Sequence, residues 1–238
     1  SMLLDALAIA RKHQKFTWFI TITCNPAELE NLKRAEGQTA ADRPDLLDRM
    51  FRKKLDMLMK DLASNGIMGK HIAHVMVPER QMRGLWHGHI TLLTQGTVTE
   101  DEVDDWVQAQ IPDYDPEHPE RNPEEKEYYE LIAKHMLHGP CGARNPNSPC
   151  MVPNKDGKKA CRFGYPKQFT EKTHLQQNGY PCYARPNNGR KIKKNGIEFD
   201  NRDIIPHNRY ILCKQKCHTN VEFTGSLSTV RYQFKYTH

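Results

Sequence analysis

The stretch VMVPERQMRGLWHGHITLL, residues 75–93, predicts two extended segments joined by a short turn. Side chains two apart on a strand share a face, so His87 and His89 project together, as do Glu79 and Gln81 on the neighbouring segment. Folding the hairpin brings these pairs face to face. Two imidazoles and an oxygen ligand form a metal site with positions open for a substrate, although a histidine pair on a strand is more often a polar face. Glu79 is the preferred third ligand because neutral ligands alone hold magnesium or manganese poorly, and Gln81 is the alternative.

Composition describes a polar chain with one sizeable core. The chain has 238 residues, of which 27% are charged, and a mean hydropathy of −0.79. It shows no membrane-spanning apolar run and no secretory signal pattern. Seven cysteines, an odd number, favour thiol and metal chemistry in a reducing compartment over a disulfide framework. A net charge of +6 is compatible with a polyanionic partner, but also with a mildly basic surface that has none.

Apolar spacing predicts the other elements. The segment FTWFITIT alternates large apolar residues with threonine and predicts a central strand. In the helix that begins at Pro44, apolar residues recur every three or four positions. The order strand, helix, strand, strand favours an antiparallel α+β fold. The predicted strands are 16–23 and 214–223, and the predicted helices are 3–13, 44–63, 97–111 with Thr99 as N-cap, and 124–137.

A second group of metal ligands follows the last of these helices. The pattern His138-x2-Cys141-x8-Cys150-x10-Cys161 offers one nitrogen and three sulfur ligands in a segment rich in proline and glycine. Structural zinc takes such a set and can order a segment that has little apolar content. His135 is an alternative nitrogen ligand. The gaps are wider than those of ordinary zinc fingers, and the other interpretation is a loop with buried cysteines. If one of these four residues is not a zinc ligand, another cysteine could take its place: Cys182, Cys213 or Cys217.

Beyond residue 169 the chain becomes basic and contains three Asn-Gly turn signals, at 178–179, 188–189 and 195–196. Cations beside tyrosines are typical of a groove for single-stranded nucleic acid, where phosphates meet the cations and bases stack on the rings. A solvated loop is the other interpretation. The residues concerned are Arg185, Arg190, Lys191, Lys193 and Lys194, with Tyr180 and Tyr183.

The last predicted element is a helix in STVRYQFKY, residues 228–236, which places Tyr232 and Tyr236 on one face. Such a pair most often means half-buried packing. Beside a metal site that is open to substrate, the two phenols are candidate covalent nucleophiles.

These features together resemble the HUH endonuclease (Rep) domain of Helitron rolling-circle transposases. The resemblance spans nearly the whole chain. Two positions depart from the family pattern: Trp86, where proline is usual, and His207, where tyrosine is common. The matching segments are FTWFITITCNP, RPDLLDRMFRKKLDMLMKDL, QMRGLWHGHI, HMLHGPCG with the later Cys150 and Cys161, GYPCYAR, CHTNVEF and YQFKY.

The resemblance implies a single ferredoxin-like HUH nuclease domain with an antiparallel sheet. Residues 3–134 and 170–238 would form its core and residues 135–169 a zinc-binding insertion. The implied activity is cleavage and rejoining of single-stranded DNA through a 5′-phosphotyrosine link, with Mg²⁺ or Mn²⁺ as the catalytic ion. A fused helicase in the full-length protein and a nuclear location are also implied.

Two other functions fit parts of the pattern. One is a zinc-stabilised module that binds DNA or RNA without chemistry, in which the histidine pair is a surface feature. The other is a metal oxygenase with two histidines and a carboxylate, which normally uses different ligand spacing and a cosubstrate pocket.

Overall fold

The computed structural model describes residues 16–25, 27, 42–80 and 85–224. Within these ranges the chain is α+β, with a four-stranded antiparallel sheet in the order β10-β1-β3-β2 and four α-helices. The strands are β1 (Trp18–Thr23), β2 (His71–Arg80), β3 (Trp86–Thr94) and β10 (Thr219–Phe223). The helices are α3 (Pro44–Ala63), α4 (Glu100–Trp106), α5 (Lys126–His135) and α6 (Arg209–Gln215).

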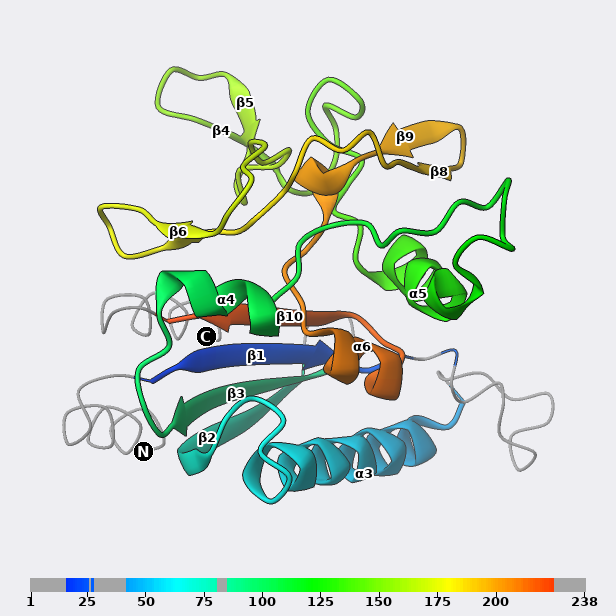
Figure 1. The fold of residues 1–238 in the computed structure, drawn as a ribbon. Helices are drawn as coiled ribbons and strands as arrows, with labels where there is room; N and C mark the ends of the chain where they lie inside the picture. The colour runs from blue at the N-terminus through cyan, green and yellow to red at the C-terminus, as the bar shows by residue number, and fades with distance from the viewer. Residues whose placement is uncertain (1–15, 26, 28–41, 81–84, 225–238) are drawn as a thin grey trace.

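Helix α3 covers one face of the sheet, and small hairpins lie on the other side (Figure 1). Alternation along β1 turns Trp18, Ile20 and Ile22 into the core that α3 closes with Leu55 and its other apolar residues. Helices α4 and α6 add residues to the same core. The opposite face of the sheet carries the alternate, mostly polar side chains, and this face holds the site described below.

Helix α3 has the bounds that the periodicity predicts, and Pro44 stands in its first turn. Helix α4 begins as predicted, with Thr99 and Glu102 forming a capping box. It ends at Trp106 instead of continuing to residue 111. The reason is tertiary, because the backbone of Gln108 pairs with that of His207 in an isolated bridge. The helix predicted over residues 3–13 lies outside the described ranges.

The region after α5 is built from short pairs of strands. These are β4 (Met151–Pro153) with β5 (Lys159–Cys161), β6 (His174–Leu175) with β7 (Pro181–Cys182), and β8 (Ile192–Lys194) with β9 (Ile197–Phe199). Single-turn 3-10 helices occupy Pro123–Glu125 and Asn201–Asp203. The turn at Asn195 and Gly196 has positive φ at both residues, as an Asn-Gly hairpin requires. Residues 188–189 form no hairpin.

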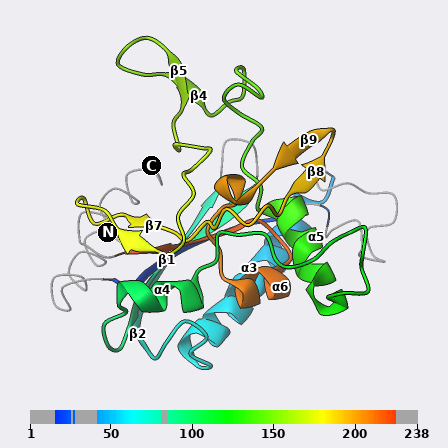
Figure 2. The ribbon, with the colours of Figure 1, turned by 45° about the horizontal axis from the view of Figure 1, so that its top comes forward.

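Helices α5 and α6 lie side by side (Figure 2), and a second hydrophobic cluster that includes Ile132, Leu212 and Ile204 joins them. The predicted strand over residues 214–223 is shorter than expected. Its first residues close α6, Lys216 takes a left-handed conformation with φ 48°, and the chain enters the sheet at Thr219. Within the described ranges, no helix combines the length and the apolar character that crossing a membrane requires.

Candidate functional site

The histidine pair lies on the sheet face that points away from α3. Glu79 on β2 stands opposite His87 on β3, and Val77 stands opposite His89. Oε2 of Glu79 lies 3.1 Å from Nε2 of His89. On the other side, the hydroxyl of Thr21 on β1 lies 3.1 Å from Nδ1 of His89. The hairpin therefore brings the predicted carboxylate and imidazoles together, and β1 adds a hydroxyl that orients one ring.

Gly88 separates the two histidines because its position faces the helix. A Cβ placed there would lie 2.5 Å from Cδ2 of Leu55, well inside van der Waals contact. The sequence His-Gly-His thus combines two side chains on the open face with a close approach of α3 on the covered face. This is a packing reason for glycine in a strand interior.

Both histidines are neutral near pH 7. Burial, with repulsion from His89 and His218, lowers the pKa of His87 to about 4. Burial also lowers the pKa of His89, although Glu79 opposes that shift. Neutral imidazole is the form that binds metal, so no proton has to be removed from either ring for ligation at neutral pH.

Glu79, His87 and His89 are less tightly gathered than the second predicted ligand set. In the described part of the chain, the one group of three or more candidate ligands with all ligand atoms within 4.8 Å of one another is His138, Cys141, Cys150 and Cys161. Gln81, Tyr232 and Tyr236 lie outside the described residues, so their positions stay predictions.

The four ligands of the Cys/His cluster come from three short elements. His138 and Cys141 flank a turn in which Gly139 has φ 103°, and a Cβ there would lie 2.9 Å from the backbone nitrogen of Cys141. Cys150 precedes β4, and Cys161 ends β5. Nε2 of His138 lies 3.3 Å from Sγ of Cys161.

The donor set of the Cys/His cluster fits zinc. One imidazole and three thiols match a structural tetrahedral site. Burial, followed by the charge of Cys161, raises the pKa of Cys141, so this thiol is protonated when the site is empty and would lose its proton to a bound cation. Burial lowers the pKa of His138 to about 4 and keeps its nitrogen available. His135, the predicted alternative, is not a member of the cluster.

The predicted DNA-contacting residues do not form one surface. Arg185 is 2% exposed and donates to the carbonyls of Ala109, Asn201 and Ile204, so it holds segments together. Tyr183 is 5% exposed. The other four predicted DNA-contacting residues, all cationic, lie in or beside the β8–β9 hairpin. Arg190 pairs with Asp113, Lys191 with Glu198, Lys194 donates to the carbonyl of Ala133, and Lys193 is exposed.

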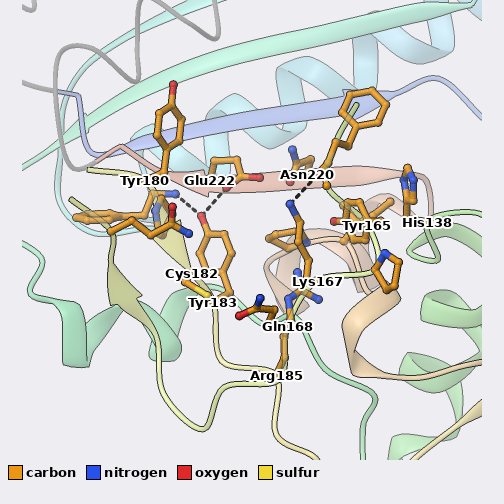
Figure 3. A pocket seen from close by; sticks show the side chains of 18 of the residues that line it. His138, Tyr165, Lys167, Gln168, Tyr180, Cys182, Tyr183, Arg185, Asn220 and Glu222 are labelled. Atoms are coloured by element: carbon orange, nitrogen blue, oxygen red, sulfur yellow. Dashed lines mark hydrogen bonds between the residues drawn. The ribbon is translucent and has the colours of Figure 1, made fainter. Parts of the chain in front are cut away.

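A cavity of about 1190 Å³ lies over β1 and β10 on the same sheet face as the histidine pair. The segment after Cys161 and the β6–β7 region form its other walls (Figure 3). Its polar residues from the sheet, Asn220 and Glu222, were not among the predicted site residues. The alternation in CHTNVEF was the available signal, since it places His218, Asn220 and Glu222 on one face.

The fold and these ligands define an α+β domain with a Cys/His site suited to zinc and a polar sheet face. Residues 1–92 match the family model of the Helitron helicase-like domain at the N-terminus. The match relates the chain to Helitron proteins and includes β1, α3, β2 and most of β3, and with them Glu79, His87 and His89. It supports a role related to Helitron transposition and is consistent with nucleic-acid partners and a fused helicase. No match was found among curated proteins.

Proposed function

We propose that this chain is an HUH-type endonuclease that nicks single-stranded DNA and rejoins it to another strand in rolling-circle transposition. The observation that carries the proposal is the convergence of Glu79 and His89 at 3.1 Å, with His87 opposite Glu79 in register, on the sheet face that α3 leaves open. The match over residues 1–92 supports the same function.

In this proposal the sheet is the core of a ferredoxin-like domain, and the Cys/His cluster holds structural zinc in an insertion at 135–169. His87, His89 and Glu79, with Gln81 as a further candidate, would hold Mg²⁺ or Mn²⁺. When bound, that ion would supply Lewis-acid stabilisation of charge on a scissile phosphate. Thr21 would fix the orientation of the His89 ring through Nδ1.

The covalent step assigns the nucleophile to Tyr232 or Tyr236. The phenolic oxygen attacks phosphorus, the bond from phosphorus to the 3′ oxygen breaks, and the departing oxygen takes a proton to become a free 3′-hydroxyl. The phenol proton passes to water. The product is a 5′-phosphotyrosine link that conserves the energy of the phosphodiester, so rejoining needs no nucleotide cofactor. Two tyrosines allow two strand ends to be held at once. In this proposal the reaction takes place in the nucleus, and a helicase fused in the full-length protein unwinds the DNA.

The test is incubation of the protein with end-labelled single-stranded DNA and manganese, followed by denaturing gel separation. We expect a protein-linked DNA band that requires metal, and that is lost when Tyr232→Phe and Tyr236→Phe are combined. The single changes identify the attacking residue. Tyr210→Phe is the matched control, because Tyr210 is an exposed tyrosine on α6, and this variant should form the band normally.

One observation favours a second candidate function: the ligand atoms of the Cys/His cluster all lie within 4.8 Å of one another, whereas Glu79, His87 and His89 are less closely gathered. The second function is a zinc-stabilised module that binds nucleic acid without cleaving it. DNA retention without a covalent band under any divalent metal would establish this function in place of the nuclease.

A further inference from the structure

The cavity over β1 and β10 has a carboxylate in its wall. Glu222 projects from β10 into the cavity, and its Oε2 accepts a 2.6 Å hydrogen bond from the hydroxyl of Tyr183 (Figure 3). That hydroxyl in turn accepts from the backbone N–H of Phe223 at 2.8 Å, which fixes its direction. Oδ1 of Asn220 is buried and has no hydrogen-bond partner among the described residues. The partly buried Glu222 carboxylate therefore faces the cavity, and Asn220 lines it from the same strand, although its Oδ1 is itself out of contact with the open space.

Acceptors of this kind favour a ligand that brings N–H donors. The pKa of Glu222 is raised above its usual value, chiefly by burial, and the hydrogen bonds from Tyr183 and Asn220 and the charges of Lys167 and Arg185 oppose this shift. An ionised carboxylate can accept several hydrogen bonds, and acceptor capacity that is left unused in a partly buried site costs free energy that a matching donor on a ligand recovers. The cavity therefore suits a polar, partly aromatic ligand with adjacent N–H groups.

Cations and rings also line the cavity. Nζ of Lys167 donates to the carbonyl of Phe163 at 2.7 Å and lies 4.7 Å from the ring centre of Tyr165. The guanidinium of Arg162 lies 4.7 Å from the ring centre of Phe163, which is 47% exposed. An ammonium group beside exposed aromatic surface is the combination that binds phosphate and stacks bases in single-strand sites.

The cavity adjoins the histidine pair through Phe19. This residue lines the cavity, stands opposite Glu222 in the sheet register, and stacks on His89 with ring centres 5.9 Å apart. Glu222 and His89 are two strands apart, which is roughly 10 Å across the sheet. One extended strand can therefore place a phosphate at the histidine pair and a nearby base in the cavity.

We propose that this cavity binds one unstacked guanine of the single strand, with the Glu222 carboxylate accepting hydrogen bonds from the base edge and Lys167 contacting the adjoining phosphate. Guanine presents N1–H and an N2 amino group side by side. Thymine offers one N–H between two carbonyls, and adenine and cytosine place an acceptor beside their amino group. The assignment rests on the proposed function, because it specifies how the same DNA is recognised.

The experiment measures equilibrium binding by fluorescence anisotropy. The protein carries Tyr232→Phe and Tyr236→Phe, and neither magnesium nor manganese is added, so no covalent product can form. The probe is a labelled oligothymidylate of roughly sixteen nucleotides. Its central position is thymine, guanine, adenine, cytosine or an abasic residue. We expect the guanine probe to bind roughly tenfold more tightly than the thymine probe.

Two variants in the same background separate base recognition from phosphate contact. Glu222→Gln keeps the size of the side chain and is expected to abolish the preference for guanine while the thymine probe binds as before. Lys167→Met is expected to weaken all probes by a similar factor and leave the ratio of guanine to thymine affinity unchanged. Melting temperatures confirm that each variant is folded. Comparing the five probes on the protein with an unchanged cavity requires no cavity variant. This comparison therefore tests the assignment even if Glu222→Gln or Lys167→Met fails to fold.

The outcomes separate the two proposals. Tight binding that is indifferent to the central base, or a guanine preference that survives Glu222→Gln, overturns the cavity assignment and leaves the nuclease proposal to its covalent-adduct assay. Absence of binding to every probe contradicts both.

Discussion

Gly88→Ala is expected to destabilise the domain and displace the histidine pair. The added Cβ would lie 2.5 Å from Cδ2 of Leu55, about 1 Å inside ordinary carbon contact. Leu55 is 2% exposed and packed in the main core, so it cannot move away without disturbing its neighbours. Overpacking of this kind costs about 1–3 kcal/mol, and the lower entropy of the unfolded alanine chain offsets about 0.4–1 kcal/mol. The net loss should be about 1–2 kcal/mol.

The assay is urea denaturation of the two single variants and the double variant Gly88→Ala with Leu55→Val. Shortening Leu55 costs about 1 kcal/mol alone, but it removes the atom that clashes. The double variant should therefore be more stable than the sum of the single effects predicts, by about 1 kcal/mol. In the adduct assay, Gly88→Ala should lower the rate by up to about a hundredfold, because it moves ligands on both sides of residue 88. Additive effects on stability, or a neutral Gly88→Ala, would refute the packing argument.

Three further predictions concern the metal ligands and acid stability. Cys150→Ser is expected to lose zinc in elemental analysis and to lower the melting temperature, whereas Cys213→Ser, outside the Cys/His cluster, should keep both. Thr21→Val removes the hydroxyl 3.1 Å from the second histidine of the pair and should weaken manganese binding, measured by titration, roughly tenfold to a hundredfold; an unchanged affinity would exclude an orienting role. Buried His207 has its pKa lowered to about 4, chiefly by burial. The unfolded chain therefore binds a proton that the folded chain does not between roughly pH 6.5 and 4, and stability should fall by about 3 kcal/mol as pH falls through that window. Urea denaturation across this pH window should show a smaller loss for His207→Gln than for wild type, and an equal loss in the two proteins would contradict the assignment.

Local pattern was sufficient for the central hairpin. The period of two places Glu79, His87 and His89 on one face of a strand pair, and the observed register puts Glu79 opposite His87. Helix α3 followed equally directly from apolar spacing and the proline at its start. These features depend on neighbours close in sequence, so tertiary contacts had little to change.

The Cys/His cluster was also predictable, because its chemistry restricts which residues can meet. One histidine and three cysteines in a segment poor in apolar residues have few other ways to become ordered. The spacing did not decide between His138 and His135. The turn at Gly139 decides it, since it brings His138 to within 3.3 Å of Cys161.

Sequence alone determined helix α3, the central hairpin, the ligand types and the face on which the histidine pair projects, because these follow from residue chemistry and from the strand and helix periods. Only the tertiary structure decided how the polar residues are used. Arg185 resembles a DNA-binding cation in sequence, yet it is buried against three backbone carbonyls. Glu222 lies in an ordinary alternating strand, yet the fold places it against Tyr183 in a cavity beside His89. Burial and partners distant in the chain set these roles, and no local pattern encodes them.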